Sequence, residues 1–300
     1  MKYVVSVAAL ALLSLSGCKT MQKSNSTTKV EFPAFSTEAH RGGRGLMPEN
    51  TIIAMRNAID FGITTLEMDT HITKDGKVVV THDDYLSPSF MLTPEGKEIP
   101  KSDAKKYPVY QMDYSLLKQF DLGSKFHADF PEQKKIKTHI PLLADLIDDV
   151  QQYSKGKKQM FYNIETKCSA KGDGVVNPGP EEFVKLLMDV IEKKGITPYV
   201  VIQSFDKRTL QVLHKKYPHV RTSFLVNNKK TVEENLEDLG FNPFILSPAY
   251  KMVDADLVKK CHDRNVKVVP WTVNTKEEII ALKQLNVDGI ISDYTNLLVD

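Results

Sequence analysis

The most constraining feature of this sequence is a regular alternation of strand-like and helix-like segments that begins at about residue 36. The strand-like runs are short and rich in β-branched residues, as buried parallel strands tend to be. Eight such units in about 265 residues predict an α/β fold, a (β/α)8 TIM barrel. Strands are expected near Ser36–Ala39, Thr64–Asp69, Met160–Glu165, Val200–Gln203, Arg221–Val226, Phe244–Leu246, Val266–Trp271 and Asp288–Ile291, with Val78–His82 as an extra strand outside the count.

Capping and stop signals separate the predicted helices. Asn50 or Thr51 caps an apolar run that stops at Gly62, and Pro180 opens a helix that Gly195 ends. Residues 85–138 break the alternation, because they hold scattered prolines and only one short helical pattern near Tyr114–Phe120. Roughly 50 residues is too long for an ordinary barrel loop, so this segment is predicted to be an insertion after the second strand.

The N-terminus has the pattern of an export signal. Lys2 precedes an apolar run, Tyr3–Leu15, that is too short to span a bilayer, and Leu15-Ser16-Gly17-Cys18 resembles a bacterial lipobox. We therefore expect a signal peptide at 1–17, lipidation at Cys18, a flexible tether at 18–34 rich in Ser, Thr, Lys and Asn, and the barrel at 35–300. The prediction is an exported lipoprotein of the cell envelope, facing the periplasm or in the outer membrane. The alternative is a plain secretory signal with a chance cysteine.

Charge argues against one class of partner. The net charge of +2 is too small to attract a polyanion, and no basic run alternates with aromatic residues. A nucleic-acid partner is therefore not expected. Contact with a membrane is expected only through the lipid anchor, and the sequence leaves the oligomeric state open.

Acidic residues at strand ends indicate a cation site. Residues i and i+2 of a strand share a face, so Glu67 and Asp69 point the same way, and Glu165 ends the next barrel strand. Carboxylates directed into a barrel are costly without a cation, and hard oxygen donors suit Ca²⁺ or Mg²⁺ better than zinc. The alternative is that these are solvated charges at strand ends.

Several motifs together resemble one family. HRGGRGLMPENT at 40–51, EMD at 67–69 and VVVTHD at 78–83 are similar to the signature of the glycerophosphodiester phosphodiesterases. Later segments agree with it, namely IPLLADLID at 140–148, NIETK at 163–167, IQSFD at 202–206, VVPWTVN at 268–274 and VDGIISDY at 287–294. The resemblance implies the same barrel, with the 85–138 insertion as a cap over its C-terminal mouth.

The resemblance also implies residue roles. His40 and His82 correspond to the family's catalytic pair, His40 as base and His82 as acid, while Glu67, Asp69 and Glu165 correspond to its metal ligands. The phosphate partners expected on residue chemistry are Arg41 and Lys167. Two further substrate contacts are expected at Glu49 and Trp271, and the alternative for Trp271 is a packing residue of the barrel rim. Asn50 is expected to be either a helix cap or a site contact. His71 is a candidate contact, and the remaining histidines, among them His127, are expected to be surface or packing residues.

The expected reaction is metal-dependent hydrolysis of a glycerophosphodiester to glycerol 3-phosphate and an alcohol. One rival is a phospholipase of the phosphatidylinositol-specific C or sphingomyelinase D kind, acting on intact lipid. A rival of another class is a non-catalytic envelope lipoprotein that binds phosphate compounds. The sequence leaves open which alcohol is released, which cation is bound, and whether water or a substrate hydroxyl is the nucleophile.

Overall fold

A computed structural model of the chain describes residues 1–3 and 30–299. Residues 4–17 of the predicted signal peptide, the lipidation residue Cys18 and the tether as far as residue 29 lie outside the described residues. Among the residues that are described, no helix is long and apolar enough to cross a membrane.

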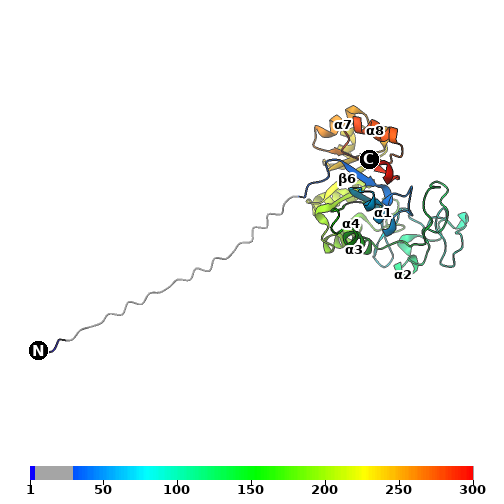
Figure 1. The fold of residues 1–300 in the computed structure, drawn as a ribbon, viewed down its shortest axis with the longest axis horizontal. Helices are drawn as coiled ribbons and strands as arrows, with labels where there is room; N and C mark the ends of the chain where they lie inside the picture. Colours follow the sequence, from blue (N-terminus) through cyan, green and yellow to red (C-terminus); the bar gives the residue numbers. More distant parts are fainter. Residues whose placement is uncertain (4–29, 300) are drawn as a thin grey trace.

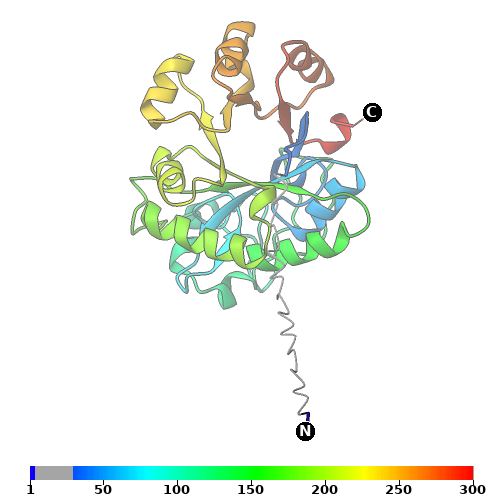
Figure 2. The ribbon, with the colours of Figure 1, turned by 90° about the vertical axis from the view of Figure 1, so that its left-hand side faces the viewer.

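The described chain folds into a barrel of parallel strands surrounded by helices (Figures 1 and 2). The sheet runs in the order β8-β7-β6-β5-β4-β2-β1-β9. It closes between its outer strands through backbone hydrogen bonds from Asp288 to Val268 (2.8 Å) and from Ile291 to Pro270 (3.0 Å). The barrel strands are β1 (Ser36–Ala39), β2 (Thr65–Ile72), β4 (Phe161–Thr166), β5 (Val200–Ser204), β6 (Arg221–Val226), β7 (Ile245–Pro248), β8 (Lys267–Val268) and β9 (Gly289–Ser292).

Helices follow the strands on the outside of the barrel, so the predicted (β/α)8 fold is confirmed. They are α1 (Ile52–Asp60), α3 (Leu143–Tyr153), α4 (Pro180–Lys193), α5 (Lys207–Lys216), α6 (Val232–Leu239), α7 (Ala255–His262) and α8 (Lys276–Gln284). After β9 comes a short 3-10 helix, Thr295–Leu297.

Strand alternation sorts side chains between the barrel interior and the helices. On β2, Leu66 and Met68 are fully buried in the core between sheet and helices, as predicted, while Glu67 and Asp69 occupy the alternate positions. Burying such an apolar side chain contributes roughly 1.5–3 kcal/mol. The apolar residues therefore determine the register that directs both carboxylates inward.

One predicted strand is shorter than expected. The strand expected at Val266–Trp271 is regular only at Lys267–Val268. Pro270 has no N–H to donate, so it interrupts the ladder, and Trp271 pairs with Ala249 only as an isolated bridge.

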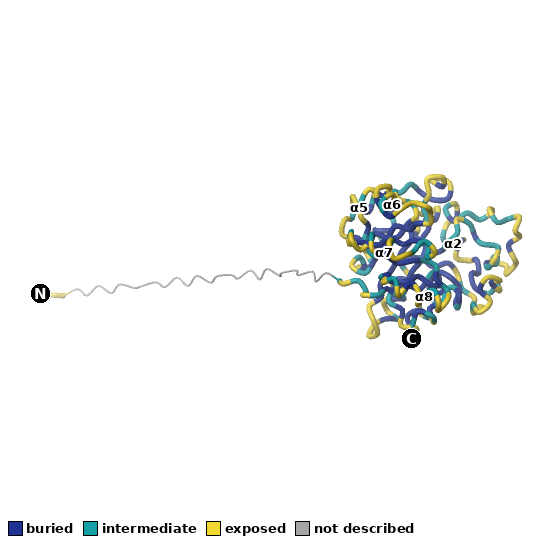
Figure 3. The backbone as a smooth tube through the Cα atoms, turned by 90° about the horizontal axis from the view of Figure 1, so that it is seen from above, coloured by how far each residue is buried: buried dark blue, intermediate teal, exposed yellow. Residues whose placement is uncertain are grey.

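The insertion lies between β3 (Val78–Val80), which pairs antiparallel with β2, and α3. It contains the short helix α2 (Tyr114–Leu117) and a hydrophobic cluster of its own that includes Leu86, Met91, Leu117 and Phe120. In Figures 1 and 3 this segment, found by the label α2, stands at one side of the barrel. The insertion after the second strand was predicted as part of the fold, and the structure confirms it.

The N-terminal residues close the other end of the barrel. Phe32 packs edge-on against Phe161 (5.6 Å between ring centres) and Phe244 (5.3 Å), which stand at the beginnings of β4 and β7. The guanidinium of Arg221, the first residue of β6, donates to the carbonyl of Val30. The chain therefore enters the barrel at the N-terminal ends of its strands.

Candidate active site

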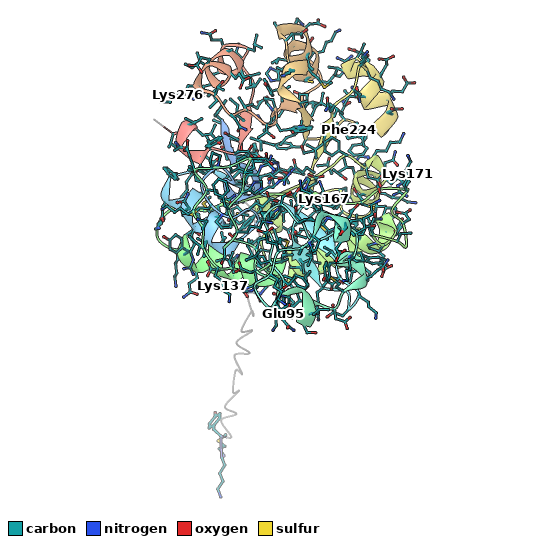
Figure 4. All side chains as sticks on the ribbon, turned by 90° about the vertical axis from the view of Figure 1, so that its right-hand side faces the viewer. Glu95, Lys137, Lys167, Lys171, Phe224 and Lys276 are labelled. Atoms are coloured by element: carbon teal, nitrogen blue, oxygen red, sulfur yellow. The ribbon has the colours of Figure 1, made fainter. Side chains whose placement is uncertain are left out.

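Most of the residues selected from the sequence gather around a pocket of about 130 Å³ at the C-terminal ends of the strands. His40, Arg41, Glu67, His82, Glu165, Lys167 and Trp271 all line it. Asp69 does not line this pocket itself, but its carboxylate lies 3.8 Å from the Lys167 ammonium, which does. Glu49 lines a neighbouring pocket. Figure 4, which looks at the molecule from the insertion side, shows Lys167 near the middle of the barrel.

The three predicted metal ligands form one buried cluster. Carboxylate oxygens of Glu67, Asp69 and Glu165 lie within 4.8 Å of one another, because Asp69 and Glu165 are register partners on β2 and β4. Oδ1 of Asp69 is buried and has no hydrogen-bond partner among the described residues. A buried carboxylate oxygen without a partner, in an all-oxygen donor set, fits a hard divalent cation.

Burial and charge act differently on these carboxylates. Desolvation, reinforced by Asp69, raises the pKa of Glu67 well above its usual range. Burial also raises the pKa of Glu165 to about 6, against the opposing effect of Lys167. Burial alone would raise the pKa of Asp69 too, but the positive charges of His82, Arg41 and Lys167 outweigh it and hold that pKa low. All three carboxylates can therefore be ionised together only when positive charge lies beside them.

Arg41 ties the first strand to this cluster. Its backbone N–H donates to Glu67 (2.7 Å), and its guanidinium donates to Glu49 (3.0 Å) and lies 3.4 Å from Asp69. Arg41 has a φ of 52°, and the glycine after it allows the tight turn. A Cβ on Gly42 would lie 2.7 Å from the Cβ of Ala54 on α1.

His40 is hydrogen-bonded to a carboxylate that was not predicted as a site residue. Its Nδ1 lies 2.5 Å from Oδ1 of Asp293, which directly follows β9. Asp293 also accepts hydrogen bonds from Arg44 (2.7 Å) and Asn274 (2.8 Å). Burial lowers the pKa of His40, and Asp293 partly offsets this effect. The second ring nitrogen of His40 is thereby left for chemistry.

His82 is positioned from two directions. Its Nδ1 lies 2.7 Å from Asp83, and its backbone carbonyl accepts a hydrogen bond from Nε2 of His71 (3.0 Å). His71 is fully buried on β2, and burial lowers its pKa to about 4. A neutral, buried His71 is therefore a positioning residue for the loop that carries His82.

Asn50 and Gln203 hold the ligand carboxylates in place. Asn50 donates to Asp69 (2.9 Å) and accepts from its backbone N–H (3.2 Å), while Thr51 provides the cap of α1. Gln203 on β5 donates to Glu67 (2.7 Å). Asn50 was predicted to be either a helix cap or a site contact, whereas Gln203, Asp293 and Arg44 were not predicted as site residues. In the sequence, only one property marked them as possible site residues: each is a polar residue at the end of a strand or in the loop that follows one.

Trp271 and Phe205 form an apolar wall of the pocket. The Trp271 indole donates to the carbonyl of Ser247 (2.9 Å), and its ring packs edge-to-face against Phe205 (5.3 Å). Trp271 is thus both a packed rim residue and part of the pocket lining.

A larger hollow of about 830 Å³ lies at the opposite end of the barrel, beside Val30 and Arg221. No Asp or Glu of the described chain lines it. It therefore lacks the carboxylate ligands that a hard divalent cation prefers, and its size alone does not make it the reactive centre.

Comparison with known proteins agrees with this geometry. Residues 40–297 match the Glycerophosphoryl diester phosphodiesterase family. A glycerophosphodiester phosphodiesterase of Caldanaerobacter subterraneus is 31% identical over 264 residues, which cover 87% of this chain and 95% of that protein.

Solved structures share the fold. A structure from Silicibacter pomeroyi has a TM-score of 0.78 at 25% identity, covering 90% of this chain and 93% of that one. A phosphodiesterase of Oleispira antarctica, solved with the product sn-glycerol-3-phosphate, has a TM-score of 0.68 at 24% identity, covering 88% and 94%. The chain described here belongs to the glycerophosphoryl diester phosphodiesterase family and is an enzyme, a phosphoric diester hydrolase.

Proposed function

We propose that the site hydrolyses glycerophosphodiesters to glycerol 3-phosphate and an alcohol, with a divalent cation held by Glu67, Asp69 and Glu165. The observation that carries this proposal is the buried cluster of these carboxylates, within 4.8 Å of one another, beside a pocket lined by His40 and His82. The solved relative from Oleispira antarctica with bound sn-glycerol-3-phosphate is consistent with this product.

The donor set determines what kind of cation fits. Three carboxylates are hard oxygen ligands, which Ca²⁺ and Mg²⁺ prefer, and a bound cation stabilises negative charge on phosphoryl oxygens. Arg41 and Lys167 line the same pocket and are the residues that bind phosphoryl oxygens directly.

The two histidines differ in their surroundings in a way that matches base and acid. Nδ1 of His40 donates to Asp293, so Nε2 carries the lone pair, and a lowered pKa keeps the ring neutral and able to accept a proton. His82 is more exposed, lies next to Asp83, and is the group we assign to protonation of the leaving alkoxide.

The pocket argues against the two rival functions. A volume of about 130 Å³ accommodates a small polar group, and the adjoining pocket of about 450 Å³ is lined mainly by charged and polar side chains rather than by an apolar surface for acyl chains. A protein that only bound phosphate compounds would need the cations of the site but not two imidazoles placed for proton transfer.

We further propose that the protein is an exported lipoprotein anchored through Cys18. This rests on the charged start, short apolar run and lipobox-like Leu15-Ser16-Gly17-Cys18 of the sequence. Phe32 packs at the barrel end opposite the candidate site, so the predicted tether joins the barrel on the side away from its mouth and leaves the mouth free to face solvent. This orientation favours water-soluble diesters over lipids in a membrane.

Removal of divalent cations is expected to abolish turnover, because the three carboxylates would then repel one another next to the phosphate. Glu67→Gln is expected to weaken cation binding by about 10-fold or more. Calorimetric titration with Ca²⁺ and Mg²⁺, together with turnover in chelator, measures both effects. Glu192→Gln, at an exposed position on α4, is the matched control. Full activity in excess chelator would contradict the proposal.

His40→Ala and His82→Ala are each expected to lower kcat by roughly 10²–10⁴-fold with little change in folding. A substrate with a nitrophenol leaving group needs no protonation, so it is expected to rescue His82→Ala and leave His40→Ala slow. The exposed residue His219 supplies the control His219→Ala. Equal rescue of both variants would rule out the assignment of acid and base.

Asp293→Asn is expected to lower the pKa of His40 further, because the carboxylate is the group that opposes desolvation of the imidazolium. Titration of the histidine ring signals by NMR measures this shift. Asp189→Asn, which removes a carboxylate paired with Lys185 on the surface of α4, is expected to leave His40 unchanged. An unchanged or raised pKa of His40 in Asp293→Asn would contradict its pairing with Asp293.

Cys18→Ser is expected to prevent lipidation and to yield a soluble or signal-retaining protein with unchanged kcat, because Cys18 lies far in sequence from the barrel. Acyl chains contribute about 0.8 kcal/mol per buried CH₂, so their loss is expected to release the processed protein from membranes. Membrane fractionation and mass spectrometry of the mature N-terminus test this. A correctly processed Ser variant that still fractionates with membranes would contradict the lipoprotein proposal.

A further inference from the structure

A second pocket, of about 450 Å³, adjoins the site and is formed largely by the insertion. We call it the insertion pocket and define it by Glu49, Asp83, Phe90, His127, Asp129 and Phe130. Arg41, Arg44 and His82 line both this pocket and the site pocket, so the two hollows share a wall. Its volume is in the range of small-molecule sites.

The insertion pocket is lined by three carboxylates and two arginines. Glu49 is 3% exposed and accepts a hydrogen bond from Arg41 (3.0 Å), while its Oε2 has no hydrogen-bond partner among the described residues and lies 3.8 Å from the Arg44 guanidinium. Asp129 is exposed and forms no ion pair with another described residue. Asp83 lies 2.7 Å from Nδ1 of His82, so the imidazolium balances its charge until His82 gives its proton to the leaving oxygen.

The positive charges in the shared wall are already engaged. The Arg41 guanidinium lies 3.0 Å from Glu49 and 3.4 Å from Asp69. Arg44 pairs most closely with Asp293 (2.7 Å), a carboxylate outside the insertion pocket, and lies 3.8 Å from Glu49 within it. The open side of the pocket, where Asp83 and Asp129 lie, therefore attracts cations.

Aromatic rings line the same pocket. Phe90 stacks on His127 with ring centres 5.1 Å apart and planes at 12°, and Phe130 packs against His127 at 5.0 Å. Burial lowers the pKa of His127, so this ring adds no positive charge at neutral pH. The Arg44 guanidinium lies 4.7 Å from the centre of the Phe130 ring and already occupies one face of it, so Phe90 is the ring we expect to meet a ligand cation.

We propose that the insertion pocket binds the alcohol part of the diester and selects alcohols that carry an ammonium group. This inference rests on the proposed function, because the acid must face the leaving oxygen, and His82 is one of the three residues that line both pockets. An alcohol leaving past His82 enters the insertion pocket, where carboxylates and aromatic rings meet its positive charge. The glycerol phosphate part remains in the smaller pocket beside Trp271.

The test is a comparison of kcat/KM for glycerophosphocholine and glycerophosphoethanolamine with that for glycerophosphoglycerol, whose alcohol is neutral. The cationic substrates are expected to be favoured by about 3- to 10-fold at low ionic strength, and this preference is expected to shrink as salt is added. A preference for the neutral substrate, or no preference at any salt concentration, would overturn the inference. Absence of turnover with all three substrates would instead contradict the proposed function.

Two variants assign the preference to the pocket. Asp129→Asn and Phe90→Leu are each expected to lower the ratio of kcat/KM for cationic over neutral substrates by about 3-fold or more. Asp129 is exposed, so its substitution leaves the fold intact. The matched control is Glu95→Gln, which removes an exposed carboxylate of the same insertion, away from Lys167 at the edge of the molecule (Figure 4). Ratios that stay unchanged in both variants would overturn the assignment.

Discussion

The candidate site depends on the burial of like charges at one end of the barrel. Glu67, Asp69 and Glu165 are held inward by strand register and are excluded from water, so their repulsion must be balanced by positive groups. Arg41 and Lys167 supply part of that balance at distances of 3.0 to 3.8 Å. The cluster therefore requires a barrel rigid enough to hold the charges together.

Hydrogen bonds below the cluster supply that rigidity. Gln203 donates to Glu67, and Asn163 donates both to Gln203 (3.1 Å) and to Glu38 (2.7 Å) deep in the barrel. Burial raises the pKa of Glu38 to about 7, although Asn163 opposes the shift. This column of polar contacts orients Glu67 from beneath, and it leaves the carboxylate face toward the pocket free for a ligand.

The two ends of the barrel have different roles, one structural and one catalytic. Phe32 and Arg221 close the N-terminal end, while the insertion adds a second hollow beside the reactive mouth. In such a barrel the strands supply a reaction centre of set geometry, and the loops between strands and helices vary substrate choice. His82 lines both pockets, so the residue that we assign to protonation of the leaving oxygen also contacts the pocket that we propose to select the alcohol.

The sequence by itself determined the fold and the central residues, because both follow from local pattern. Strand alternation predicted that Glu67 and Asp69 share a face, and motif positions identified His40, His82 and Glu165. Only the tertiary structure decided which partners these residues have. Asp293 lies 253 positions from His40, and Gln203 lies 136 positions from Glu67. The insertion pocket likewise forms only when Phe90 and Phe130 fold back beside Glu49. Such contacts depend on closure of the barrel, which brings the ends of distant strands together, and no local periodicity encodes it.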